Sequence, residues 1–182
     1  LILLLVVFIS YQSFSNERTV NVDKSFVKWT GKEITTKIHF GKLNISSGSI
    51  NLDDNGVSGE VKVDMETLVV EDLQGEWGKK LEGHLKSDDF FSVDKFKESS
   101  IKTTSSTKKS DNSYEVQGVL TIKDISHPIT FDVKVDGNVI NASLTFDRSL
   151  YDVRFRSGSF FENLGDKLIV DDIDLEVTLE LN

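Results

Sequence analysis

The residues best suited to chemistry lie together in the stretch LEGHLKSDDFFSVDKF, at positions 81–96. His84 is followed at short spacing by the adjacent carboxylates of Asp88 and Asp89. A histidine beside a carboxylate is the pair that general acid–base catalysis uses, and the same side chains are candidate metal ligands. The other two histidines stand on distant segments, so the spacing predicts no metal site.

Several features argue against an enzyme. The chain has no Gly-x-Ser-x-Gly elbow, phosphate-binding loop or zinc-protease helix. It also has no cysteine, which removes a thiol nucleophile, thiolate metal sites and disulfides. His84 ends a predicted helix, where a cation is favourable, and Asp88 and Asp89 belong to the chain reversal that follows. We therefore predict no enzymatic activity, metal or cofactor; a hydrolase or isomerase that uses His84 with one of these acids is the alternative.

Composition restricts the partners. The chain carries 21 basic and 30 acidic side chains, a net charge of −9. Such a surface repels phosphate backbones, so we predict no nucleic-acid partner. The 182 residues suffice for one domain with a sizeable core. The sequence leaves the oligomeric state open, a homodimer included.

The first fifteen residues differ from the rest. Positions 1–9 are uninterrupted apolar residues, fewer than the roughly 20 that a membrane span needs but suited to a secretory signal. Ser13-Phe14-Ser15 has the small-x-small pattern of a cleavage site. We therefore expect residues 1–15 to be a truncated signal peptide and residues 16–182 a periplasmic or secreted domain without a stable membrane span. A buried N-terminal strand is the alternative.

Beyond residue 19 the dominant period is two. Apolar and polar residues alternate over 57–66, 129–135 and 173–182, which is typical of strands with one buried face. Asp136-Gly137 is a hairpin turn signal. Leu73, Trp77, Leu81 and Leu85 recur every four residues and predict an amphipathic helix over about 71–86; a short helical turn is expected near 160–164.

These elements predict an all-β fold, a single antiparallel sheet of about eight strands with one helix. Closure into a β-barrel is favoured over a filled β-sandwich because it removes exposed strand edges. An eight-stranded barrel either fills with side chains or holds one small ligand. The sequence does not decide between a hollow and a filled barrel.

Aromatic and leucine side chains are the candidates for lining such a cavity. For any one of them, an ordinary place in the core is the alternative. As a set they exceed what a small barrel needs, and the pairs in DDFF and SGSFF fall outside regular strands, where they would line a cavity mouth. The predicted apolar lining comprises Trp29, Phe40, Trp77, Leu81, Leu85, Phe90, Phe91, Phe96, Phe131, Phe146, Phe155, Phe160 and Phe161.

An arginine cluster follows in TFDRSLYDVRFRSGSFF. Arg148, Arg154 and Arg156, together with His84, are candidates for binding an anionic head group, because the guanidinium fork suits phosphate and carboxylate. The alternative is structural pairing of the arginines with nearby acids.

The motifs VKWTGKEI, LEGHLKSDDFFSVDKF, GVLTIKDISHPITF, LTFDRSLYDVRF and GSFFENLGDKLIVDDIDLEVTLEL stand in order over about residues 20–182. In these motifs the chain resembles the YceI-like polyisoprenoid-binding family, especially exported members from Bacteroidetes. The resemblance implies a lipocalin-like barrel whose interior binds a long isoprenoid chain, and no enzyme activity is established for the family as a whole. It predicts an exported carrier of an isoprenoid or similar lipid; a structural or stress-related interaction module with a filled barrel is the alternative.

Overall fold

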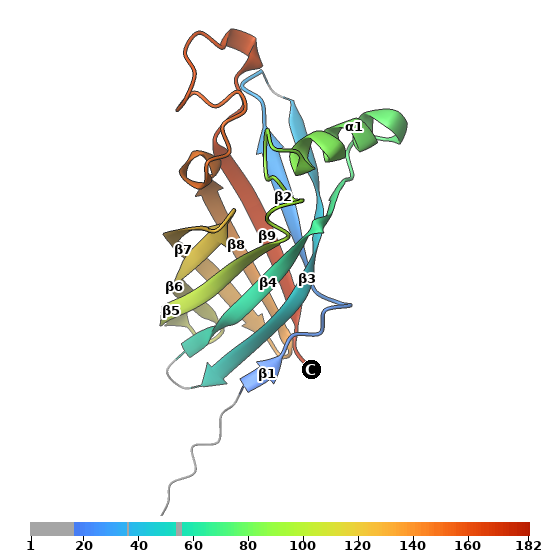
Figure 1. Ribbon diagram of the computed structural model, residues 1–182. Coiled ribbons are helices and arrows are strands. Elements are labelled where there is room, and N and C mark those ends of the chain that lie inside the picture. The colour runs from blue at the N-terminus through green and yellow to red at the C-terminus, as the bar shows by residue number, and fades with distance from the viewer. Residues whose placement is uncertain (1–16, 36, 54–55) are drawn as a thin grey trace, which may run out of the picture.

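The computed structural model describes residues 17–35, 37–53 and 56–182 (Figure 1). The predicted signal peptide, 1–15, lies outside these residues. The described elements are β1 (Glu17–Thr19), β2 (Phe26–Lys32), β3 (Ile38–Asp53), β4 (Gly56–Val70), α1 (Gly75–Lys86), β5 (Glu98–Ser110), β6 (Ser113–Ile122), β7 (Ile125–Asp136), β8 (Val139–Asp147), the 3₁₀ turns η1 (Arg148–Tyr151) and η2 (Gly165–Lys167), and β9 (Asp172–Glu180).

The strands close into a barrel. Antiparallel pairing runs in the order β3-β2-β9-β8-β7-β6-β5-β4, and β4 pairs back onto β3, which completes a ring of eight strands. The short β1 pairs with β3 beyond the segment that β2 occupies. The predicted all-β antiparallel barrel is therefore confirmed, and the sandwich alternative was wrong.

Alternation along each strand decides what faces inward. In β8, Ile140, Leu144 and Phe146 are buried while Asn141 and Ser143 are exposed. Successive side chains of a strand point to opposite faces, so this period of two directs one apolar row of each strand into the barrel.

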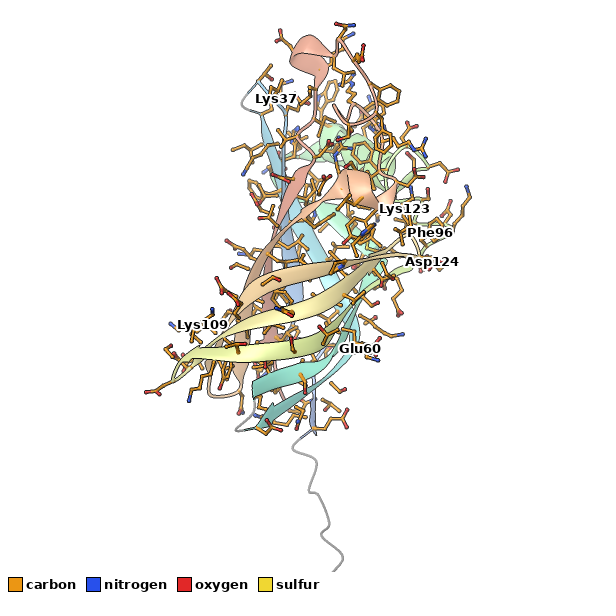
Figure 2. All side chains as sticks on the ribbon, turned by 90° about the vertical axis from the view of Figure 1, so that its left-hand side faces the viewer. Lys37, Glu60, Phe96, Lys109, Lys123 and Asp124 are labelled. Carbon is orange, nitrogen blue, oxygen red and sulfur yellow. The ribbon has the colours of Figure 1, made fainter. Side chains whose placement is uncertain are left out.

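The barrel has two different ends. The turn end carries the β3–β4, β5–β6 and β7–β8 connections; the last is a tight turn in which Gly137 has φ +58°. The helix end, where β2 ends and β3 begins, carries α1, residues 87–97 and residues 148–171 (Figure 1). Figure 2 shows Lys37 close to the helix end and Lys109 close to the turn end.

The helix begins later than its apolar period predicted, at Gly75 instead of near residue 71. The preceding residues are held by β3 instead: the Glu71 N–H donates to the Phe40 carbonyl (2.9 Å), and Asp72 Oδ1 accepts from the Phe40 N–H (3.0 Å). Gly75 then reverses the chain with φ +65°, a conformation that favours glycine.

The second predicted helical turn, 160–164, was misplaced. The 3₁₀ turn of this region is η2, Gly165–Lys167. Asn163, before η2, and Gly165, its first residue, both have positive φ, 58° and 52°, so the chain changes direction as it enters the turn.

Candidate functional site

The barrel encloses a cavity of about 380 Å³. Ile50 and Val57 line it near the turn end, and Arg156 and Ile169 line it near the helix end, so it extends along most of the barrel. Its volume falls within the roughly 300–1,000 Å³ typical of small-molecule sites. The barrel is therefore hollow, the point that the sequence left open.

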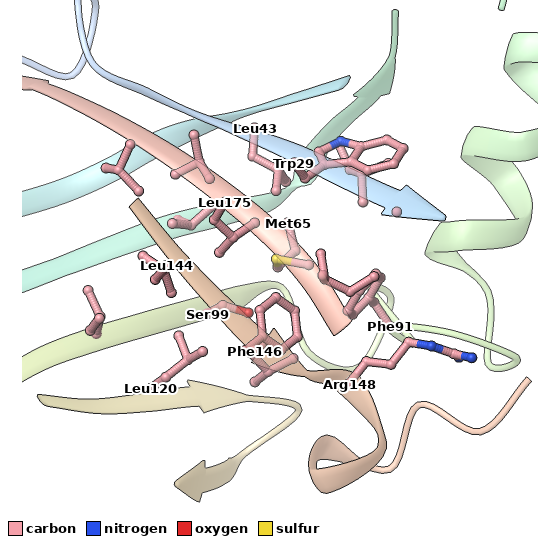
Figure 3. A pocket seen from close by; sticks show the side chains of 18 of the residues that line it. Trp29, Leu43, Met65, Phe91, Ser99, Leu120, Leu144, Phe146, Arg148 and Leu175 are labelled. Atoms are coloured by element: carbon pink, nitrogen blue, oxygen red, sulfur yellow. The ribbon is translucent and has the colours of Figure 1, made fainter. Parts of the chain in front are cut away.

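Aliphatic side chains make up most of the cavity wall. Leu43, Met65, Leu120, Leu144 and Leu175 come from five different strands and surround the interior in Figure 3. The sequence predicts a mainly aromatic wall, which the structure does not show. Branched and unbranched aliphatic residues at inward strand positions supply it instead, and such residues give no signal that separates a cavity from a packed core.

Eight of the thirteen predicted lining residues do line the cavity. They are Trp29, Leu81, Leu85, Phe90, Phe91, Phe131, Phe146 and Phe155. The other five do not: Phe40, Trp77, Phe96, Phe160 and Phe161.

Each of these five corrections has a structural reason. Phe40 has the opposite strand parity to the buried Leu43, so it points outward from β3. Trp77 lies on the solvent side of α1 with 72% of its surface exposed. Phe160 and Phe161 are exposed in the segment before η2, and Phe96 lies at the outer edge of the barrel (Figure 2).

The stretch 81–96 forms a wall of the cavity at the helix end. Leu81 and Leu85 of α1 line it, as do Phe90 and Phe91 of the following segment. Val93 is almost fully buried in the core. This segment thus packs across the barrel end, and its residues Leu81, Leu85, Phe90 and Phe91 line the cavity as predicted.

His84 also lines the cavity and joins two segments of the helix end. Its Nε2 lies 3.1 Å from Asp89 Oδ2, and its ring packs edge-on against Phe90 and Phe155, with centroids 5.0 and 4.5 Å away. Asp88 pairs with Lys95 at the surface (2.8 Å), a hydrogen bond that holds the pKa of Asp88 below its ordinary value. The two acids therefore serve different partners.

The geometry shows no nucleophile activated by a histidine within the described chain. The ring hydrogen bonds of His39, His84 and His127 go to Asp72, Asp89 and the Leu150 carbonyl, and none goes to a hydroxyl or an amine. A base beside a nucleophile is the signature of covalent catalysis. The residues that the structure describes also contain no cluster of three or more His, Cys, Asp or Glu that could hold a metal ion.

The arginine cluster divides into three environments. Arg148 is fully buried: it donates to the carbonyls of Val153, Ile169 and Val170 (3.1, 3.1 and 3.4 Å), and its Nη2 lies 3.1 Å from Asp171 Oδ1. Burial lowers its pKa, partly offset by the neighbouring acids, yet a guanidinium stays charged at neutral pH. The side chain lines the cavity, but most of its donors are engaged by the protein.

Arg154 and Arg156 differ from Arg148 and from each other. Arg154 pairs with Asp152 on the surface and does not line the cavity. Arg156 does line it, with the guanidinium 5.1 Å from the Phe155 ring centroid, and no ion pair of Arg156 occurs within the described residues. The structural pairing that stood as the alternative thus accounts for two of the three arginines.

Some polar lining residues were missed at the sequence level. Ser99 and Thr103 of β5 and His39 of β3 line the cavity. Ser99 and Thr103 share the parity of the inward Ile101, so alternation would have identified them. The cavity is thus apolar along its length, with charged side chains such as Arg156 at the helix end.

The fold and cavity define an antiparallel β-barrel built around an apolar internal site. The chain matches the family model described as the YceI-like domain over residues 19–181, and it belongs to this family. The resemblance read from the sequence motifs is therefore confirmed at the level of the family. None of the helices in the described residues is long and apolar enough to cross a membrane.

Curated relatives of this chain include proteins from Yersinia. A UPF0312 protein of Yersinia enterocolitica is 29% identical over 114 residues, 62% of this chain, and a UPF0312 protein of Yersinia pestis matches to the same extent. The match spans 57% of the length of each relative. These relatives give no support to the predicted Bacteroidetes-type origin.

Solved structures share the fold. BcnA of Burkholderia cenocepacia superimposes with a TM-score of 0.67 at 18% identity, covering 88% of this chain and 98% of BcnA. A polyisoprenoid-binding domain from Saccharophagus degradans, implicated in plant cell wall breakdown, gives a TM-score of 0.59 at 12% identity and covers 92% and 99%. At these identities the likeness establishes the fold.

Proposed function

We propose that the protein is a carrier that holds an isoprenoid or similar long-chain lipid inside the barrel. The observation that supports this proposal most directly is the apolar cavity of about 380 Å³, which extends between the two ends of the barrel. A filled barrel, required by the alternative of an interaction module, does not fit this cavity. The polyisoprenoid-binding domain that shares the fold supports the same ligand class.

Apolar transfer alone accounts for tight binding. Each isoprene unit buried contributes on the order of 2 kcal/mol before the costs of ordering the chain. A cavity lined by Leu, Val, Ile and Phe side chains provides this term without a specific contact at each unit. Binding therefore depends on the shape and length of the cavity more than on individual polar residues.

The polar end of the ligand is proposed to lie at the helix end, near Arg156 and His84. Both side chains line the cavity there, and Arg156 has no carboxylate partner within the described residues. Arg148 is assigned to holding residues 148–171 in place, and Arg154 lies outside the cavity.

We also propose that the protein is exported and acts in the periplasm or outside the cell. The apolar run at positions 1–9 and the Ser13-Phe14-Ser15 pattern support this. Cell fractionation with N-terminal sequencing of the mature protein tests the proposal. A cytoplasmic protein that retains residues 1–15 would contradict it.

The carrier function is tested by organic extraction of the purified protein followed by mass spectrometry. Ala142→Phe places a ring at an inward lining position of β8, while Ser143→Phe places the same ring at the next, outward position. We expect co-purified lipid to be lost in Ala142→Phe and retained in Ser143→Phe. Absence of lipid from the wild-type protein, or equal lipid in both variants, would refute the proposal.

A catalytic function of His84 has one observation in its favour, the contact of Nε2 with Asp89 beside the cavity. His84→Ala separates the two readings. If the carrier function holds, His84→Ala changes how much lipid the protein retains, because a contact with the head group is removed. The extracted lipid is then chemically identical to that of the wild type. Accumulation of a different, unconverted lipid in His84→Ala would support catalysis instead.

A further inference from the structure

The exposed apolar side chains are gathered at one end of the molecule. Of the nine large apolar residues that are exposed in the described chain, eight belong to the helix end and one, Val22, to the turn end. Scattered exposed apolar residues are normal on a soluble protein, but segregation to one end is the kind of pattern that marks an interaction surface. The eight are Ile34, Ile38, Phe40, Val69, Trp77, Leu150, Phe160 and Phe161.

Two of the aromatic rings have a cation above them. Lys80 Nζ lies 5.0 Å from the Trp77 ring, and the Arg154 guanidinium lies 5.0 Å from the Phe160 ring. Figure 1 shows α1 and the segment that carries η2 projecting at this end. A ring with a flexible cation beside it suits the boundary between acyl chains and head groups, where the ring enters the apolar layer and the cation complements the lipid phosphate.

We propose that the helix end docks onto the surface of a lipid bilayer. The inference rests in part on the proposed carrier function: the same end holds the polar residues of the cavity, so docking here lets an apolar chain enter the barrel without crossing water. The exposed residues stand on separate segments with charged neighbours such as Lys37 between them. A bilayer interface accommodates this arrangement, whereas a protein partner requires one continuous complementary face.

The net charge of −9 argues against attraction to anionic lipids as the driving force. Insertion of the aromatic rings therefore supplies most of the binding free energy, with a local contact from Lys80 to phosphate. Arg154, beside the Phe160 ring, is already paired with Asp152. The probe is therefore a vesicle of zwitterionic phosphatidylcholine. Adding an anionic lipid to the vesicles is expected to leave binding unchanged or weaker.

The two tryptophans provide separate reporters. Trp77 is exposed on α1, whereas Trp29 is 8% exposed and lines the cavity. In Trp29→Phe, phosphatidylcholine with brominated acyl chains is expected to quench Trp77 fluorescence. In Trp77→Phe, a brominated long-chain alcohol added without vesicles is expected to quench Trp29 if the cavity accepts an apolar chain.

Matched variants locate the docking surface. Phe160→Ser with Phe161→Ser is expected to lower vesicle partitioning by at least about tenfold, because two rings lose their apolar burial. Val22→Ser, an equally exposed residue at the turn end, is expected to leave partitioning unchanged. Thermal unfolding confirms that these surface variants remain folded.

Each failure has its own meaning. If the alcohol quenches Trp29 but vesicles do not quench Trp77, the docking proposal falls and the carrier function stands. If vesicles quench Trp77 and nothing quenches Trp29, docking holds and the carrier function fails. Docking is also refuted if Phe160→Ser with Phe161→Ser retains full vesicle binding, or if sedimentation shows that these residues hold a dimer that ignores vesicles.

Discussion

Arg148 offers the sharpest test, because its position at the cavity suggests a ligand contact while its geometry indicates a structural role. Its side chain has no exposed surface, and Asp171 beside it is 18% exposed. Replacement by methionine keeps an apolar stem similar to that of arginine but removes the guanidinium with its charge and its donors. Asp171 would then be an acid without its cation, and the carbonyls of Val153 and Ile169 would lose a donor.

Breaking a buried ion pair by removing one partner costs about 3–5 kcal/mol. Asp171 keeps two hydroxyl donors, Ser157 Oγ at 2.8 Å and Ser159 Oγ at 2.9 Å, so we expect the lower end of this range. For a domain of this size about 3 kcal/mol corresponds to a decrease in the melting temperature of roughly 6–12 °C. Guanidinium denaturation and scanning calorimetry measure the two quantities.

Arg154→Met is the matched control from the same cluster. Its partner Asp152 and its own side chain are both well exposed, and a surface pair of this kind contributes at most about 1 kcal/mol. Removing the orphaned charge as well, in Arg148→Met with Asp171→Asn, should recover part of the lost stability. If Arg148→Met unfolds at the wild-type temperature but loses its lipid, Arg148 is a head-group ligand and the structural assignment is wrong.

Three further predictions concern the framework. Burial raises the pKa of Tyr151 to about 12, whereas the pKa of an unfolded tyrosine is about 10. The contribution of the protonated Tyr151 to folding stability is therefore complete below about pH 10 and is lost as the pH rises towards 12. Tyr151→Phe should abolish this loss of stability in alkaline unfolding curves. Hydrogen bonds from Lys32 and Thr145 lower the pKa of Asp174. The contribution of Asp174 to folding stability is therefore present above about pH 4 and is lost at lower pH. Asp174→Asn should make the stability less dependent on pH in the acid range. Gly41→Ala should destabilise the barrel by about 1–3 kcal/mol, because the new Cβ would lie 1.9 Å from the Val69 carbonyl oxygen. Gly83→Ala, in an open part of α1, should instead stabilise the protein. Chemical denaturation measures both changes.

The strands could be predicted because alternation is a local property. Phe131 and Phe146 sit in alternating runs, and both point inward as expected. The same rule would have excluded Phe40, whose parity is opposite to that of Leu43. In α1 the apolar period correctly identified Leu81 and Leu85, which line the cavity, but it wrongly included Trp77, which is exposed near the start of the helix.

The sequence could not predict that the barrel is hollow, or that the three arginines lie in different environments. An inward row of aliphatic residues looks the same whether opposite walls meet or leave a cavity, because the volume depends on the curvature of the whole sheet. Arg148, Arg154 and Arg156 are neighbours in the sequence, but a 3₁₀ turn and left-handed residues at Asp152 and Arg156 direct their side chains to different places.

The distribution of polar groups along the cavity also determines which way a ligand would enter. Near the turn end the wall consists of residues such as Ile50, Val133, Ile140 and Leu179, which offer no donor to a charged head group. An anionic group there would lose its hydration without a partner, a cost of several kcal/mol. At the helix end Arg156, which has no ion pair within the described residues, would compensate the same group, with His84 beside it. A lipid in this barrel should therefore lie with its tail towards the turn end, and head-group labels should contact residues 148–171.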